Sequence, residues 1–279
     1  SKDLVLHNGK LKAYMRSLTV DDDTDNWHQF HSSRKETPDE VSDLDIILMR
    51  KDPPFNMDFV YTTQLLEIAE QKGVFVTNKP QAIRDSNEKL YATWFPHLCL
   101  ETLVTKNISD LKNFHGEQRD IIIKPLDGMG GSSIFRVRDK DSNASVIFET
   151  MTEQNERFCM AQRFLPEIKN GDKRILMVDG EPIPFSLARV PSQGETRGNL
   201  AAGGSGVIQE LTENDKRICK EIGGVLRERG LLFVGLDVIG NHLTEINVTS
   251  PTCLREIEKG TGLNIAEKVV KAAVQKIRP

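Results

Sequence analysis

The sequence predicts a mixed α/β (α+β) fold in which a short parallel sheet precedes a series of antiparallel hairpins. Near the amino end, apolar runs at 44–49 (LDIILM) and 73–80 (GVFVTNKP) flank an amphipathic segment at 56–72. That order is typical of a parallel β–α–β unit. Further apolar strands are joined by tight turns, as in antiparallel hairpins. Those turns contain Asn8–Gly9, Asp179–Gly180 and Gly240–Asn241.

Composition limits the class of protein. The 279 residues are 38% hydrophobic, which suffices for a sizeable core and for two or three subdomains. The net charge of −4 predicts neither nucleic acid nor an anionic membrane surface as a partner. The longest apolar runs are strand-sized, and no secretory signal is visible. Four widely spaced cysteines favour a reduced, cytoplasmic protein without a zinc site.

Several segments between the strands read as helices and caps. Residues 21–42 are polar, with Trp27 and Phe30 as the large side chains, and we expect a solvated helix and loop there. Asp85 or Ser86 is expected to cap a short helix that carries Lys89, and a domain boundary is expected near 84–86. Later helices are predicted from caps at Ser109 and in the Thr212–Asp215 capping box, with a last helix at 265–277.

A glycine-rich loop, LDGMGGSS (126–133), separates the predicted strands IIIK and SIFRV, and Lys124 closes the first of them. The loop lacks the G-x-x-x-x-G-K-[ST] pattern of a P-loop and leads into a strand, so the dinucleotide fingerprint also fails. Its backbone N–H groups suit a flap over a triphosphate. An ordinary flexible hairpin loop is the alternative.

Two arginine-bearing segments come next in the chain. The hairpin at 172–190 places Arg174 and Arg189 near opposite ends of its strands, so they approach each other only if the register allows. Residues 191–207 are small and glycine-rich, with Arg197 near the centre. Such a segment is either a plain loop or a lid over a reacting centre. At the end of the first parallel strand, Arg50 is either a surface arginine or part of a site.

The hairpin at 231–252 carries Asp237, Glu245 and Asn247 in an apolar setting. Glu245 and Asn247 share one face of a strand. Asp237 joins that face only if it lies opposite Glu245, which we expect from a three-residue loop that pairs Ile239 with Leu243. Two carboxylates and an amide on one face suit a hard divalent cation such as Mg²⁺. A solvated polar face is the alternative.

Six segments together resemble the bacterial glutathione synthetases, which are ATP-grasp ligases: ILMRKDPPF, VTNKPQAIRDSNEKL, IIIKPLDGMGG, GDKRI, ETRGNLAAGG and GLDVIGNHLTEINVTSPT. The resemblance covers the whole chain and implies an ATP-grasp fold in three parts. These are an N-terminal parallel α/β substrate domain (1–85), a small central subdomain with the flap (86–165) and a C-terminal antiparallel subdomain (166–279) with a lid at 191–206. The family has a further strand and helix in front of residue 1, and we expect some substrate contacts to come from them.

The resemblance also implies a reaction and a set of roles. ATP would drive ligation of γ-glutamylcysteine to glycine through an acyl phosphate, in a cytoplasmic homotetramer that uses Mg²⁺, with Mn²⁺ as a substitute. The nucleotide ligands implied are Lys89, Lys124, Gly128, Gly130, Gly131 and Asp172. The metal ligands are Asp237, Glu245 and Asn247, and the catalytic arginines are Arg174 and Arg197. The substrate contacts are Arg50, Arg189, Ser250 and Thr252.

Elementary chemistry agrees with these roles. A carboxylate that attacks a γ-phosphate needs cations to offset repulsion, and an acyl phosphate must be kept from water. No side-chain nucleophile is required, so we expect Cys253 to be a packing residue. Two alternatives stay open: another ATP-grasp ligase, such as a D-alanine–D-alanine ligase, and a non-catalytic ATP-binding module. The presence of Arg174 and of the complete set of three metal ligands argues against the module.

Overall fold

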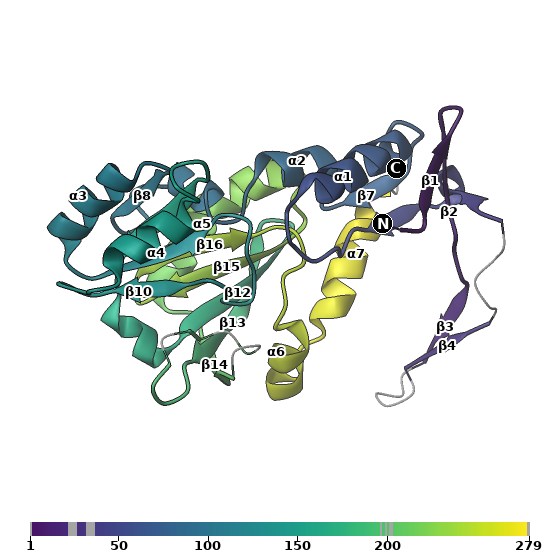
Figure 1. Cartoon of the computed structure of the whole chain (residues 1–279). Helices are drawn as coiled ribbons and strands as arrows, with labels where there is room; N and C mark the ends of the chain where they lie inside the picture. The colour runs from purple at the N-terminus through teal and green to yellow at the C-terminus, as the bar shows by residue number, and fades with distance from the viewer. Residues whose placement is uncertain are drawn as a thin grey trace.

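The computed structural model describes residues 2–21, 27–31, 37–195, 197–198, 200 and 203–277 (Figure 1). Its strands are β1 (Leu4–His7), β2 (Lys10–Ala13), β3 (Leu18–Val20), β4 (His28–Phe30), β5 (Asp39–Glu40), β6 (Ile46–Leu48), β7 (Phe75–Thr77), β8 (Thr102–Thr105), β9 (Ile121–Pro125), β10 (Phe135–Val137), β11 (Cys159–Arg163), β12 (Asp172–Val178), β13 (Glu181–Val190), β14 (Ser205–Glu210), β15 (Phe233–Ile239) and β16 (His242–Asn247). Its α-helices are α1 (Met57–Glu70), α2 (Pro80–Asp85), α3 (Ile108–Gln118), α4 (Ala144–Met151), α5 (Glu213–Glu228), α6 (Leu254–Thr261) and α7 (Ile265–Ile277). Short 3-10 helices are η1 (Val41–Asp43), η2 (Tyr91–Trp94) and η3 (Pro166–Asn170).

The amino-terminal part contains the predicted β–α–β unit. Strands β6 and β7 pair in parallel, and α1 connects them. The helix begins at Asn56, whose side chain accepts a hydrogen bond from Phe59 N. It buries Phe59, Leu66 and Ala69 in a core that it shares with β2 and β7. The predicted hairpin around Asn8–Gly9 is confirmed as β1–β2, to which β5 adds.

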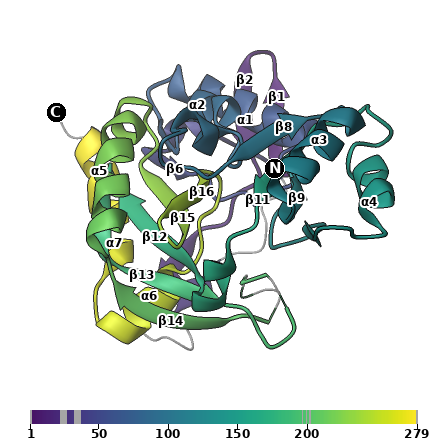
Figure 2. The same ribbon diagram turned by 90° about the vertical axis from the view of Figure 1, so that its left-hand side faces the viewer.

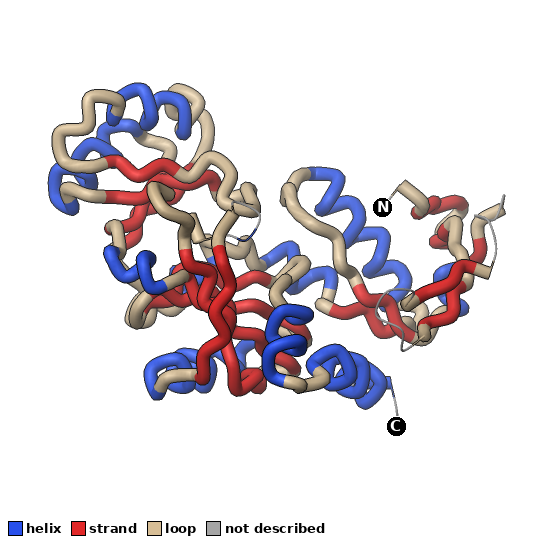
Figure 3. The backbone as a smooth tube through the Cα atoms, turned by 90° about the horizontal axis from the view of Figure 1, so that it is seen from below, coloured by secondary structure: helices blue, strands red, loops and turns tan. Residues whose placement is uncertain are grey.

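Two predicted helices are wrong. The described part of 21–42 contains strands in place of a helix, and β3 and β4 form a separate two-stranded ribbon at the outer edge of the molecule (Figures 1 and 3). Its β-branched and aromatic residues favour strands. The acidic residues 22–23 lie outside the described residues. The segment 87–95 forms only η2, because the Asn87 side chain accepts from the backbone N–H groups of Lys89 and Leu90 and makes a tight turn.

A four-stranded antiparallel sheet in the order β10–β9–β11–β8 forms the middle part of the chain. Helices α3 and α4 pack on it around Leu111, Ile123 and Phe148, which are completely buried or nearly so. The cap of α3 is Asn107, whose side chain accepts from Ser109 N at 2.8 Å, so the helix begins slightly before the predicted cap. The glycine-rich loop connects β9 to β10 as expected.

The carboxyl-terminal part is a five-stranded antiparallel sheet in the order β14–β13–β12–β15–β16 (Figure 2). Side chains alternate between its two faces. On β12, Ile175 and Met177 pack in the core that includes α5, while Leu176 and Val178 pack in the core that includes α6 and α7. The predicted capping box at Thr212–Asp215 is confirmed at the start of α5.

The alternation decides where a site can lie. Asp172 and Arg174 share the face of Leu176 and Val178, but they lie at the other end of β12. At that end, the neighbouring surface is the four-stranded sheet with its glycine-rich loop.

All four cysteines are free, and Cys253 packs in the core as expected. None of the helices in the described parts of the chain is long and apolar enough to cross a membrane.

Candidate active site

The hairpin β15–β16 brings Asp237 and Glu245 opposite each other, as predicted. The predicted loop is wrong, because Ile239 pairs with His242 and not with Leu243. A two-residue turn at Gly240–Asn241 is followed by a β-bulge, in which Thr244 is the extra residue. Gly240 adopts the left-handed conformation expected for this turn, with φ of 58°.

The bulge explains how a two-residue turn still aligns the carboxylates. Leu243 and Ile246 both pack in the core beneath α5, although they are three residues apart. On a regular strand, residues three apart point to opposite faces of the sheet. The additional residue Thr244 therefore switches the residues after it to the opposite face. Thr244 Oγ1 donates to the carbonyl oxygen of Asp237 at 3.1 Å, which stabilises the bulge. Glu245 and Asn247 consequently face the cleft.

Asp237 is held by two arginines from neighbouring strands. Arg174 Nε and Nη2 donate to its two carboxylate oxygens at 2.5 and 3.0 Å, and Arg189 Nη2 lies 2.9 Å from Oδ2. Only 3% of Asp237 is exposed. Burial alone would raise its pKa, but the two guanidinium groups outweigh that effect and hold the pKa well below the usual range. The register therefore does bring Arg174 and Arg189 together.

Glu245 is held by a lysine from outside the sheet. Lys89 Nζ donates to Glu245 Oε1 at 2.9 Å and to the carbonyl oxygen of Gly128 at 2.7 Å. Burial opposes the charge on both side chains, but their attraction lowers the pKa of Glu245 and raises the pKa of Lys89. Lys89 thereby connects the linker, the glycine-rich loop and β16.

Two further charged residues lack some of their expected partners. Burial lowers the pKa of Lys124, whose ammonium group makes no ion pair with any residue in the described parts of the chain. Asp172 Oδ2 accepts from Arg189 Nη2 at 2.5 Å, whereas its Oδ1 is buried and has no hydrogen-bond partner among the described residues. Burial raises the pKa of Asp172 to about 7, although Arg189 opposes the rise. Both residues are therefore available to a ligand.

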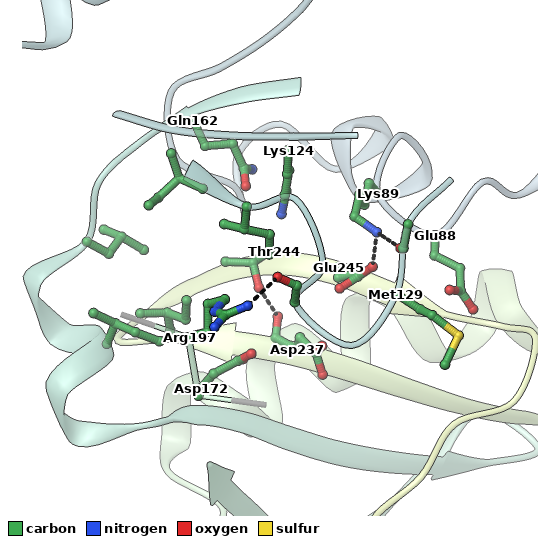
Figure 4. Close-up of a pocket in the computed structure, with 18 of the residues that line it drawn as sticks. Glu88, Lys89, Lys124, Met129, Gln162, Asp172, Arg197, Asp237, Thr244 and Glu245 are labelled. Carbon is green, nitrogen blue, oxygen red and sulfur yellow. Dashed lines mark hydrogen bonds and ion pairs between the residues drawn. The ribbon is translucent and has the colours of Figure 1, made fainter. Parts of the chain in front are cut away.

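One cleft between the two sheets is lined by six of these charged residues, namely Lys89, Lys124, Asp172, Arg174, Asp237 and Glu245 (Figure 4). One side is apolar and is formed by Leu100, Ile122, Ile134, Leu165 and Ile168. The other side holds the charged residues described above and the loop glycines Gly128, Gly130 and Gly131. Among the described residues, no group of three His, Cys, Asp or Glu side chains is placed to hold a metal ion.

Arg197 joins the two glycine-rich segments. Its Nη1 donates to the carbonyl oxygen of Gly131 at 3.3 Å and its Nη2 to Glu195 Oε2 at 2.6 Å. Within the predicted lid (191–206), residues 196, 199 and 201–202 lie outside the described residues, and Ser205 and Gly206 already belong to β14. The motion predicted for this segment stays a prediction.

None of the four predicted substrate residues lines this cleft, although Arg189 and Thr252 contact residues that do. Arg50 Nη2 donates to the carbonyl oxygen of Pro251 at 2.7 Å, and Arg174 Nη1 lies 3.5 Å from Thr252 Oγ1. The segment Ser250–Thr252 thus runs between two arginines. Arg50 also lines a smaller cavity together with Asn78 and Thr249. Arg189 is only 3% exposed and points to Asp172 and Asp237.

Two residues at the site were not predicted from the sequence. Glu88 lines the cleft, and burial together with Glu245 raises its pKa. Asn78 is 5% exposed and binds backbone atoms of the five-stranded sheet and of the residue after it. Glu88 adjoins Lys89 in the sequence, which is a weak signal. Asn78 gives no such signal, because the sequence around a single asparagine does not indicate that its side chain is buried.

Comparisons with known proteins agree with this geometry. The model of the prokaryotic glutathione synthetase ATP-grasp domain matches residues 88–262, and that of the N-terminal domain of the same enzymes matches residues 1–84. The chain belongs to the prokaryotic glutathione synthetase family. Glutathione synthetase from Escherichia coli strain K12 is 56% identical over 270 residues, or 97% of this chain and 84% of the relative.

Other relatives and structures extend the comparison. A glutathione synthetase from Yersinia pestis is 58% identical over 256 residues, which cover 92% of this chain and 79% of the relative. Among solved structures, D-cycloserine synthetase DcsG superposes with a TM-score of 0.64 at 12% identity, with 85% of each chain covered. At that identity the likeness shows the fold alone. The family and the fold confirm the predicted ATP-grasp ligase architecture.

Proposed function

We propose that this chain ligates γ-glutamylcysteine to glycine, with cleavage of ATP to ADP and phosphate, and that an acyl phosphate is the intermediate. One structural observation supports the proposal in addition to family membership. Four carboxylates, two lysines and Arg174 converge on a single cleft beneath a glycine-rich loop, and Asp237, both lysines and Arg174 are buried there. A binding site for a neutral ligand would have no use for so many buried charges, because each costs desolvation energy.

ATP would lie with its base on the apolar side of the cleft and its phosphates towards the charged side. The Lys124 ammonium group, which forms no ion pair with the described residues, is placed for the phosphates, and Lys89 reaches the same region from the linker. The backbone of Gly128, Gly130 and Gly131 would cover the phosphates. The unpartnered Asp172 Oδ1 is the acceptor we assign to the nucleotide or its ion.

Asp237, Glu245 and Asn247 fit Mg²⁺ by the chemistry of their donors. Asn247 Nδ2 donates to the carbonyl oxygen of Gly235 at 3.2 Å, which leaves its Oδ1 as a ligand. Mg²⁺ keeps water and phosphate oxygens among its six ligands, so it needs few ligands from the protein. When bound, it would offset the negative charge of the phosphates. Mn²⁺ accepts the same type of ligand and is the substitute we expect.

The reaction needs stabilisation of negative charge at two steps. The dipeptide carboxylate attacks the γ-phosphorus and ADP leaves; the glycine amine then attacks the acyl carbon, loses a proton and expels phosphate. Arg174 is fixed by Asp237 and keeps Nη1 directed to Thr252, so it is preorganised to stabilise an oxyanion. We assign to Arg197 the developing charge on the phosphoryl group beneath the flap.

The dipeptide and glycine would contact the segment Ser250–Thr252 and the arginines beside it. Arg50 and Arg189 are the assigned partners of the substrate carboxylates, although Arg189 is now engaged by Asp172 and Asp237. We further propose domains at 1–85, 86–165 and 166–279. A cytoplasmic homotetramer, without nucleic acid or membrane as a partner, is proposed from the family resemblance.

ADP release from the purified chain tests the proposal. We expect release with ATP and Mg²⁺ only when γ-glutamylcysteine and glycine are both present. Arg174→Ala should lower kcat by about 10²–10³-fold, as loss of an oxyanion donor does. Glu245→Ala should abolish turnover. Arg217→Ala, which removes an exposed arginine on α5, is the matched control.

Other outcomes contradict the proposal in distinct ways. Turnover with paired D-alanine instead of the glutathione precursors would assign the site to another ATP-grasp ligase. ATP binding without turnover on either pair would leave the non-catalytic binding module.

A further inference from the structure

The partly buried carboxylate of Glu88 holds the backbone immediately after β16. Glu88 Oε1 accepts three hydrogen bonds: from Val248 N at 2.9 Å, from Thr249 N at 2.9 Å and from Thr249 Oγ1 at 2.8 Å. The backbone carbonyl of Glu88 also accepts from Ile246 N at 2.9 Å. The residue preceding Lys89 is therefore attached both to the end of β16 and to the two residues beyond it.

Asn78 holds the same backbone from the other side. Its Nδ2 donates to the carbonyl oxygens of Val248 at 2.7 Å and of Phe233 at 2.8 Å, and its Oδ1 accepts from Phe233 N at 2.9 Å. Val248 is thus fixed at its N–H by Glu88 and at its carbonyl by Asn78. The two clamping residues come from outside the sheet, at the end of β7 and in the turn before η2.

The clamped residues stand between two functional positions. Asn247, assigned to the metal, precedes Val248, and Ser250, assigned to substrate, comes directly after Thr249. The strand ends at Asn247, so the sheet does not fix the residues beyond it. Side-chain hydrogen bonds from Glu88 and Asn78 replace the missing ladder bonds there. A shift of about 1 Å in such supports is enough to lower activity strongly.

We infer that Glu88 is a positioning residue, which acts through Val248 and Thr249 to place Asn247 and Ser250 for metal and substrate. The inference rests on the proposed function. Glu88 also lines the cleft beside Lys89 (Figure 4), and its Oε2 makes no hydrogen bond with the described residues. The competing role is a direct one, in which Oε2 itself contacts ligand.

Glu88→Gln separates the two roles. The amide keeps one carbonyl oxygen, which can accept all three hydrogen bonds, but it replaces Oε2 with a nitrogen and removes the charge. Positioning predicts that Gln retains values within about two-fold of the unmodified chain, whereas Glu88→Ala raises the apparent constants for Mg²⁺ and γ-glutamylcysteine about 10–100-fold. The KM for ATP should change least, because neither substitution alters Lys124 or the apolar side of the cleft.

Hydrogen exchange at the Val248 and Thr249 amides gives a readout independent of turnover. Both amides should exchange faster in Glu88→Ala and remain protected in Glu88→Gln. Thr249→Val removes only the hydroxyl donor and should give an intermediate change in exchange with a stable fold. Glu181→Ala, which removes an exposed glutamate, is the control.

Each possible result either supports or contradicts a positioning role for Glu88. Equal damage from Gln and Ala would assign a direct role to Oε2 and overturn the inference, as would unchanged kinetics and exchange in Glu88→Ala. If Glu88→Ala fails to fold, Gln and Thr249→Val still give the comparison. Lack of turnover in the unmodified chain would refute the proposed ligase, while the exchange data would still report whether Glu88 holds this backbone.

Discussion

The molecule contains two antiparallel hairpins of opposite character, β15–β16 and the β3–β4 ribbon. In β15–β16, Leu236, Val238 and Leu243 are completely buried, and the charged Asp237 is buried with them. In the ribbon, Leu18 is 43% exposed and Val20 is 65% exposed. None of the hydrophobic clusters formed by the described residues includes a ribbon residue. The same secondary structure thus serves two different environments.

The difference shows which kind of misplaced residue is informative about function. A buried carboxylate is costly unless cations and hydrogen bonds compensate, so the arginines around Asp237 mark a position where charge is needed. Exposed apolar side chains are common on protein surfaces and carry less information. The ribbon is held internally by contacts such as that of Arg16 with the Phe30 ring, whose centroid lies 4.0 Å from Cζ.

The largest expected effect is that of Asp237→Asn. The substitution keeps the shape but leaves Arg174 and Arg189 facing each other without the carboxylate. Removal of one partner from a buried ion pair destabilises a protein by about 3–5 kcal/mol. Urea unfolding should show this loss, together with loss of turnover. An unchanged midpoint would mean that the charges are solvated, as they are in an exposed hairpin.

Leu243→Ala is expected to have the next largest effect. Its side chain is fully buried beneath α5, so truncation should cost about 2–5 kcal/mol from lost burial and a residual cavity. Urea unfolding with an unchanged slope is the measurement. A cost below about 1 kcal/mol would show that the core at the bulge can collapse around the cavity.

The sequence predicted the partners on this hairpin better than their local geometry. Alternation put Glu245 and Asn247 on one face, and the expected three-residue loop placed Asp237 opposite Glu245. The bulge at Thr244 was missed because periodicity cannot tell an extra loop residue from an extra strand residue: both restore the pairing of Asp237 with Glu245. Only the packing of both Leu243 and Ile246 under α5 separates the two cases.

Contacts between segments that are far apart in the chain could not be predicted from the sequence alone. Glu88 and Asn78 act on Val248 from 160 and 170 residues away in the chain, so no local spacing announces them. By contrast, Asp237 and Lys124 stood out from their local sequence, and Lys89 was assigned through the family resemblance. The cleft brings these three residues together. The segment 21–42, which contains β4, was mistaken for a helix and loop because a polar segment with few large apolar residues has no clear period.

Gly240→Ala should have a smaller effect than either core change. The residue has φ of 58°, which costs an L-residue about 1–2 kcal/mol, and an added Cβ would lie 3.2 Å from Glu167 Cγ. Gly9→Ala is the matched control, because Gly9 also has positive φ but nothing within 4 Å of an added Cβ. Thermal unfolding should rank Gly240→Ala as the more destabilising. A reversed order would show that the Glu167 side chain moves aside without cost.

The smallest effects belong to the ribbon. Leu18→Ala, the counterpart of Leu243→Ala, and Trp27→Ser remove side chains that are nearly half exposed, so each should change the free energy of unfolding by no more than about 0.5 kcal/mol. Turnover should stay the same, since β3 and β4 contribute nothing to the cleft. Unfolding should be followed at two protein concentrations about ten-fold apart. A loss that is larger at the higher protein concentration and shrinks on dilution would mean that another molecule covers these side chains in solution. The two hairpins would then differ in their partners and not in their burial.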